Sequence, residues 1–125
     1  MSHPQATNQR AVKDFYQLIL DRCYRANLFK DPVSIDTFDP GLFQSEDSLD
    51  NHLTQLIVPG ITRLLDRGLF DLYQVLYSVD VDERKFKERV MDLKNTTMIP
   101  SVAAFMIIDR LKARYKAYPL LTEQS

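Results

Sequence analysis

Apolar side chains recur at intervals of three and four residues along most of this chain, and that period belongs to α-helices. The first stripe lies within residues 12–26, at Val12, Phe15, Tyr16, Ile19, Cys23 and Ala26. Similar stripes run through residues 49–65 and 69–76, between charged and polar positions. We therefore expect an all-α fold: an irregular bundle of five or six helices in a single domain, residues 1–125, with an ordered core of about residues 8–118 and frayed termini.

Prolines divide this helical pattern near the start of the chain. Asp-Pro pairs at residues 31–32 and 39–40 interrupt the period, because a proline disfavours helical geometry in the residue before it. The spacing predicts a first helix over residues 7–29. The longest loop then covers residues 30–45, and its apolar residues indicate that it packs on the body of the protein.

The second helix contains a proline. Ser45 precedes two acidic residues and is well suited to cap the helix start. Pro59 lies inside the apolar run that follows, where it removes a backbone donor and clashes with the carbonyl four residues earlier. The helix must kink at Pro59 or split there in two, and the sequence leaves both possibilities open. Gly68 fits a helix C-terminus.

Three more helices are expected in the second half of the chain. They cover residues 69–78, residues 83–93 and residues 100–117. The last is apolar nearly all round over residues 102–108, which predicts a central position for its first half. The best strand candidate, residues 76–81, is short and alone, and an isolated strand is not stable.

Composition indicates an ordinary globular protein, and the lack of a secretory signal and of a membrane-spanning stretch predicts a cytoplasmic location. Apolar residues make up 45% and charged residues 26% of the 125 residues. The single cysteine, Cys23, excludes an intramolecular disulfide, and its place on an apolar stripe favours a buried core residue over a reactive thiol. The first ten residues show no apolar run behind a basic start, and no stretch approaches the ~20 apolar residues of a membrane-spanning helix. We expect no secretory signal and no membrane association.

The net charge of −1 hides a difference between the two parts of the chain. Residues 1–81 carry 7 basic and 11 acidic side chains, whereas residues 82–125 carry 9 basic and 6 acidic ones. Four cations of the last helix could contact an anion such as a nucleic-acid phosphate: Arg110, Lys112, Arg114 and Lys116. The same cations would also stabilise the dipole at a helix C-terminus. A nucleic-acid partner is not favoured, because the chain as a whole is not basic.

No pattern in the sequence predicts catalytic chemistry, a metal or a cofactor. Asp80, Asp82 and Glu83 are close enough to suggest a hard cation, but helix capping explains them and the calcium-loop pattern is missing. His52 and Cys23 do not supply the three or four converging ligands of a zinc site. We therefore predict no catalytic residues and do not favour an enzyme.

The aromatic content favours a protein-interaction function. Seven Phe and six Tyr are more than one small core easily hides, and aromatic residues are favoured anchors in interfaces. We expect self-association or a protein partner, with Phe38, Phe43, Tyr73 and Tyr77 as interface residues because they lie in or next to loops. The alternatives are nucleic-acid binding by the basic C-terminal half and a small-molecule pocket between helices.

One segment carries a local resemblance. Residues 72–83, LYQVLYSVDVDE, resemble segments of small, uncharacterised, all-helical bacterial proteins. The resemblance implies a helical fold and assigns no chemistry to any residue.

Overall fold

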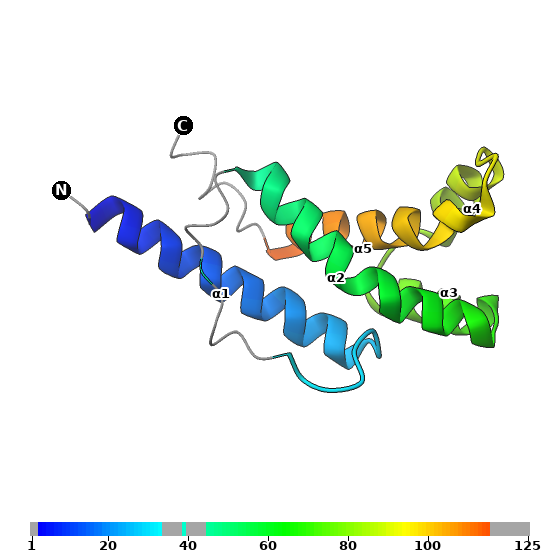
Figure 1. Ribbon diagram of the computed structural model, residues 1–125, viewed down its shortest axis with the longest axis horizontal. Helices are drawn as coiled ribbons and strands as arrows, with labels where there is room; N and C mark the ends of the chain where they lie inside the picture. Colours follow the sequence, from blue (N-terminus) through cyan, green and yellow to red (C-terminus); the bar gives the residue numbers. More distant parts are fainter. Residues whose placement is uncertain (1–2, 34–38, 40–44, 116–125) are drawn as a thin grey trace.

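The computed structural model is an all-α bundle, as expected, and describes residues 3–33, 39 and 45–115. Five α-helices and one short 3-10 helix form its described part (Figure 1): α1 (His3–Arg25), α2 (Glu46–Arg67), α3 (Leu69–Ser78), α4 (Glu83–Met91), η2 (Thr96–Met98) and α5 (Ile99–Tyr115). Residues 76–81, the best strand candidate, form the end of α3 and the connector that leads to α4.

The ends of α1 differ from the prediction. The helix begins earlier than predicted, at His3, and ends sooner, at Arg25. Asn27 adopts the left-handed conformation with φ of 69°, and the N–H of Leu28 donates to the Cys23 carbonyl at 3.0 Å. This pattern is a Schellman motif, in which asparagine takes the place that glycine usually holds. The helix therefore stops before the prolines that seemed to set its limit.

The end of α3 has the same geometry. Asp80 is left-handed, with φ of 64°, and the N–H of Val81 donates to the Leu76 carbonyl at 2.8 Å. The chain then turns at once into α4, whose first turn is capped by the Asp82 side chain accepting from the N–H of Arg84 at 2.9 Å. The two helix ends thus make a tight connector between α3 and α4.

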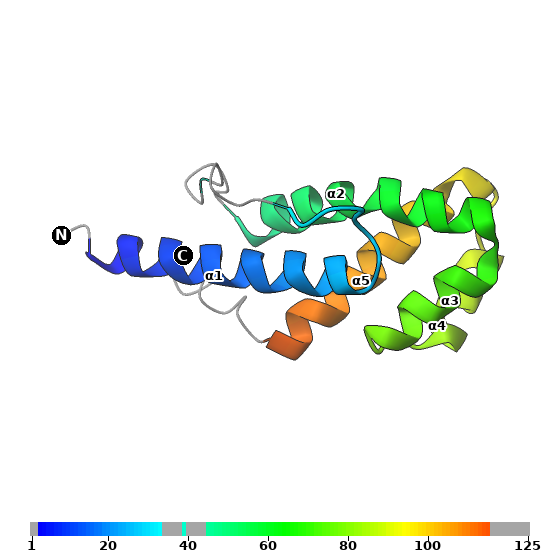
Figure 2. The ribbon, with the colours of Figure 1, turned by 90° about the horizontal axis from the view of Figure 1, so that it is seen from below.

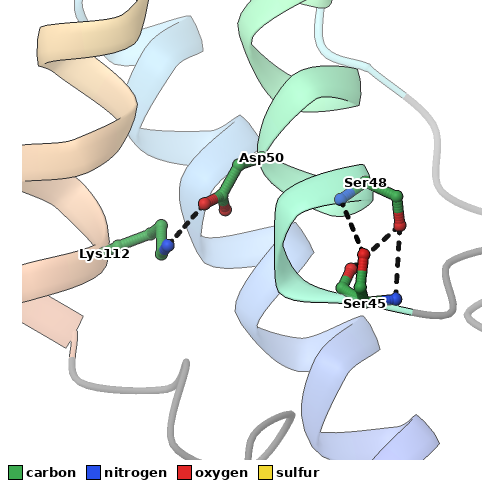
Figure 3. Close-up of polar contacts among 4 residues, drawn as sticks. All are labelled: Ser45, Ser48, Asp50 and Lys112. Carbon is green, nitrogen blue, oxygen red and sulfur yellow. Dashed lines mark hydrogen bonds and ion pairs between the residues drawn. The ribbon is translucent and has the colours of Figure 1, made fainter.

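Helix α2 runs unbroken through Pro59, which excludes two separate helices. It begins with a reciprocal capping box, in which the Ser48 N–H donates to Ser45 Oγ at 3.2 Å and the Ser45 N–H donates to Ser48 Oγ at 3.4 Å (Figure 3). Figure 1 shows the axis of α2 changing direction near the middle of the helix, as a proline inside a helix requires. Gly68, with φ of 128°, ends the helix.

One hydrophobic core joins all five α-helices. Helix α5 packs against α1, α2 and α4, and Figure 2 shows it running obliquely between the α1–α2 pair and the α3–α4 pair. Its buried side chains are Ala103, Ala104, Ile107, Ile108 and Leu111. The position is as central as predicted, but Phe105, in the same apolar run, is 51% exposed because it lies on the opposite face of the helix.

Candidate functional site

Helix α3 exposes aromatic side chains on its outer face. Phe70 and Tyr77 are 71% and 87% exposed. They are seven residues apart, or nearly two full turns, so both lie on one face of the helix. The inner face carries the buried Leu72 and Leu76. This ten-residue helix therefore has one apolar face in the core and another in solvent.

Tyr73 lies between these two faces and contacts α4. Its ring packs edge-on against Phe86, with centroids 6.3 Å apart and planes at 81°. The Lys87 Nζ lies 5.1 Å from the centroid of the Tyr73 ring, within the distance of a cation–π interaction. The core thus fixes the Tyr73 ring, and the ring links the outer faces of α3 and α4.

Met91 extends the exposed apolar area onto α4. It follows Lys87 by one helical turn and lies on the same flank of α4, the flank that faces α3. Its side chain is 83% exposed. We define the α3–α4 surface as Leu69, Phe70, Tyr73, Tyr77 and Met91. Since an aromatic side chain offers 150–250 Å², Phe70 and Tyr77 alone expose roughly 300 Å². Contiguous apolar areas of this size often mark interaction sites.

Charged groups border the α3–α4 surface in matched pairs. Lys87 Nζ lies 3.7 Å from Glu83 Oε1, and Arg84 Nε lies 3.5 Å from Glu88 Oε1. Both are exposed pairs one helical turn apart, which stabilise a helix only slightly. An apolar centre with a polar border is the usual composition of a protein interface.

The predicted interface residues lie partly on this surface. Tyr77 is exposed at the end of α3, but Tyr73 lies within the helix and is half-buried, because α4 packs against it. Phe38 and Phe43 lie outside the described residues. Phe70 is not among the predicted interface residues, although its spacing of seven residues from Tyr77 places the two on one helix face.

Two of the four predicted anion contacts form ion pairs within the protein. Arg110 Nη2 lies 2.5 Å from Asp80 Oδ2, and this hydrogen bond, with the charge of Arg110, lowers the pKa of Asp80. Lys112 Nζ lies 2.5 Å from Asp50 Oδ2 (Figure 3), and its side chain is only 12% exposed. Arg114 is exposed, and Lys116 lies outside the described residues.

Cys23 and the acidic segment of the α3–α4 connector have structural positions. Cys23 is fully buried, and burial raises the pKa of its thiol to about 12. Asp80 and Asp82 are engaged by Arg110 and by the start of α4. Among residues 3–33, 39 and 45–115, no group of three or more His, Cys, Asp or Glu side chains could hold a metal ion.

Comparisons with known proteins add no relative. No family model, no curated protein and no solved structure matches the chain. Within the described part of the chain, every helix is too short or too polar to cross a membrane.

Proposed function

We propose that this protein is a small interaction module that self-associates through the α3–α4 surface. The observation that carries the proposal is the pair Phe70 and Tyr77, exposed together on the outer face of a helix whose inner face is already in the core. The largest apolar patch of a soluble domain is often functional, and a two-fold homodimer is the commonest way to cover one.

The surface is suited to pairing with itself. In a two-fold dimer with antiparallel α3 helices, Phe70 of each protomer would pack near Tyr77 of the other, with Tyr73 close to the axis. The two contacts would be identical, as an isologous interface requires. The border of Glu83–Lys87 and Arg84–Glu88 pairs presents both signs of charge, so electrostatic repulsion between the borders of two copies is weak.

The size of the surface predicts a weak dimer. Stable interfaces bury about 800 Å² on each partner, and the exposed rings of α3 with Met91 supply far less than that area. We therefore expect a dissociation constant in the micromolar range, about −8 kcal/mol or weaker. A cytoplasmic setting suits the protein, because Cys23 is a buried free thiol.

The nucleic-acid alternative receives less support. Its principal candidates included Arg110 and Lys112, and both are engaged by carboxylates. Phosphate binding would have to break or compete with these ion pairs.

Sedimentation velocity from about 1 µM to about 1 mM protein tests the proposal. We expect a concentration-dependent dimer in the unsubstituted protein and a monomer in the Phe70→Ser/Tyr77→Ser double variant. Leu18→Ser is the matched control, because Leu18 is an exposed apolar residue of α1 away from the surface. The dimer should change little with added salt, whereas binding to a polyanion weakens steeply. A monomer at every concentration, or a dimer that survives the double substitution, would refute self-association through this surface.

A further inference from the structure

A concave region lies on the flank of α4 that faces α5, away from the α3–α4 surface. It has a volume of about 610 Å³ and lies between the α3–α4 connector, α4 and α5. Small-molecule sites commonly have volumes of about 300–1,000 Å³. We call this region the α4–α5 cleft.

Two cations of α4 form one side of the cleft. Lys85 and Arg89 are one helical turn apart and lie on the same flank of the helix. The tight connector at Asp80 and Asp82 sets the direction of α4, and so places this flank toward α5. Within the described residues, neither Lys85 nor Arg89 forms an ion pair.

Helix α5 forms the opposite side of the cleft, where the charged Asp109 and Arg110 lie beside an apolar area. Phe105, Met106 and Ala113 line it. The guanidinium carbon of Arg89 lies 5.8 Å from the centroid of the half-exposed Phe105 ring. The arrangement therefore sets an aromatic face directly beside a positive charge.

The lining of the cleft holds as many carboxylates as cations, and not all of them are paired. Asp80 is bonded to Arg110 at 2.5 Å, and Asp82 accepts the Arg84 N–H at the start of α4. Asp109 is the third acid of the lining. The backbone hydrogen bond leaves the charge of Asp82 in place, so Lys85 and Arg89 share the cleft with two carboxylates, Asp82 and Asp109, and form an ion pair with neither.

We propose that the α4–α5 cleft binds a small planar organic anion, with its ring against Phe105 and its negative group between Lys85 and Arg89. Arginine and lysine bind carboxylates and phosphates through charge-assisted hydrogen bonds, and arginine also stacks on planar rings. An aromatic carboxylate and a nucleoside monophosphate share this chemistry. The proposal is independent of self-association, because the cleft and the α3–α4 surface lie on opposite flanks of α4.

NMR titration of the full chain, with amide shifts recorded for each ligand, tests the proposal. The probes are benzoate, adenosine monophosphate, the neutral benzamide and the cation benzylammonium. We expect saturable shifts around α4 and α5 with one or both anions, and weaker or no binding of benzamide and benzylammonium. Tighter binding of adenosine monophosphate would identify the nucleotide as the ligand class, and tighter binding of benzoate the aromatic carboxylate.

Substitutions then separate the cleft from general charge attraction. Arg89→Gln should weaken anion binding about ten-fold, as the loss of a charge-assisted hydrogen bond does. Phe105→Leu should weaken it while the charge is kept. Arg84→Gln is the matched control, since Arg84 is an exposed cation of the same helix that does not line the cleft. If Arg89→Gln fails to fold, Lys85→Gln takes its place.

The proposal would be overturned by three results. These are the absence of saturable shifts with either anion, binding of benzylammonium as tight as that of benzoate, and an equal loss of affinity in Arg84→Gln and Arg89→Gln. Phe70→Ser/Tyr77→Ser should leave anion binding unchanged. This variant therefore distinguishes failure of the self-association proposal from failure of the anion-binding proposal.

Discussion

The hydroxyl of Tyr16 lies 2.9 Å from Nε2 of His52, and this hydrogen bond joins α1 to α2. The two rings are also stacked, with centroids 5.7 Å apart and planes at 22°. Tyr16 is buried, as its place on the first apolar stripe predicts. His52 is half-buried against α1.

Titration of this pair should limit stability at both ends of the pH range. Burial lowers the pKa of His52 below its ordinary value of 6.5, so the folded protein favours the neutral ring. The resulting stability is present above pH 6.5 and is lost as the pH falls through the lower folded pKa. Burial raises the pKa of Tyr16 above 10.0, so its contribution is present below pH 10.0 and is lost as the pH rises through the higher folded pKa.

Urea unfolding between about pH 8 and about pH 5 measures the His52 effect. As the pH is lowered, the free energy of unfolding should decrease in the unsubstituted protein. It should decrease less steeply in His52→Gln, which keeps a polar side chain but cannot titrate. If the free energy of unfolding changed equally with pH in the two proteins, His52 would not contribute to the pH dependence of stability.

Gly60→Ala should destabilise the protein although alanine is the better helix former. A Cβ at this position would lie 2.0 Å from the Leu28 carbonyl oxygen, because the turn after α1 passes against α2 there. Backbone atoms must move to make room, and we expect a loss of about 2–4 kcal/mol, larger than the ~1 kcal/mol gain in helix propensity. Chemical unfolding gives the value, and a variant as stable as the unsubstituted protein would contradict the close approach.

Pro59→Ala should have the opposite effect at the neighbouring position. Pro59 is exposed and lies inside a continuous helix, where it removes one backbone hydrogen bond. Alanine restores the donor, and we expect the free energy of unfolding to rise by about 1 kcal/mol or more. A decrease in the same unfolding experiment would instead show that core packing needs the bend in α2.

The helix content could be predicted from the sequence because each helix buries a periodic apolar stripe. The end of α1 could not, since Asn27 adopts a left-handed conformation that gives no clear signal outside glycine, whereas the predicted span 69–78 agrees with α3. Pro32 drew attention away from Asn27, whereas Gly68 marks the end of α2 as predicted. The sequence therefore predicted the end of α2 and both limits of α3 better than the limits of α1.

The candidate site was predictable only in part. The spacing of apolar residues in α3 assigns Leu72 and Leu76 to the core, but whether Phe70 or Tyr73 contacts α4 depends on how the two helices pack. The ion pairs of Arg110 and Lys112 join residues 30 and 62 positions apart, and no local pattern indicates such partners. The positions of Arg110 and Lys112 on their own helix therefore do not reveal that carboxylates of other segments already bind them.

The Asp50–Lys112 pair between α2 and α5 should contribute more to stability than the exposed pairs of α4. Its side chains are only 24% and 12% exposed, so removal of one partner leaves the other charge partly buried (Figure 3). We expect Asp50→Leu and Lys112→Met each to lower the free energy of unfolding by about 1–3 kcal/mol. The double variant should lose clearly less than the sum, because neither charge then remains in the interface. Urea unfolding of the four proteins closes this double-mutant cycle. If Lys112 acted only on the dipole of α5, its substitution would cost about 0.3–1 kcal/mol whether or not Asp50 were present, and the two effects would add.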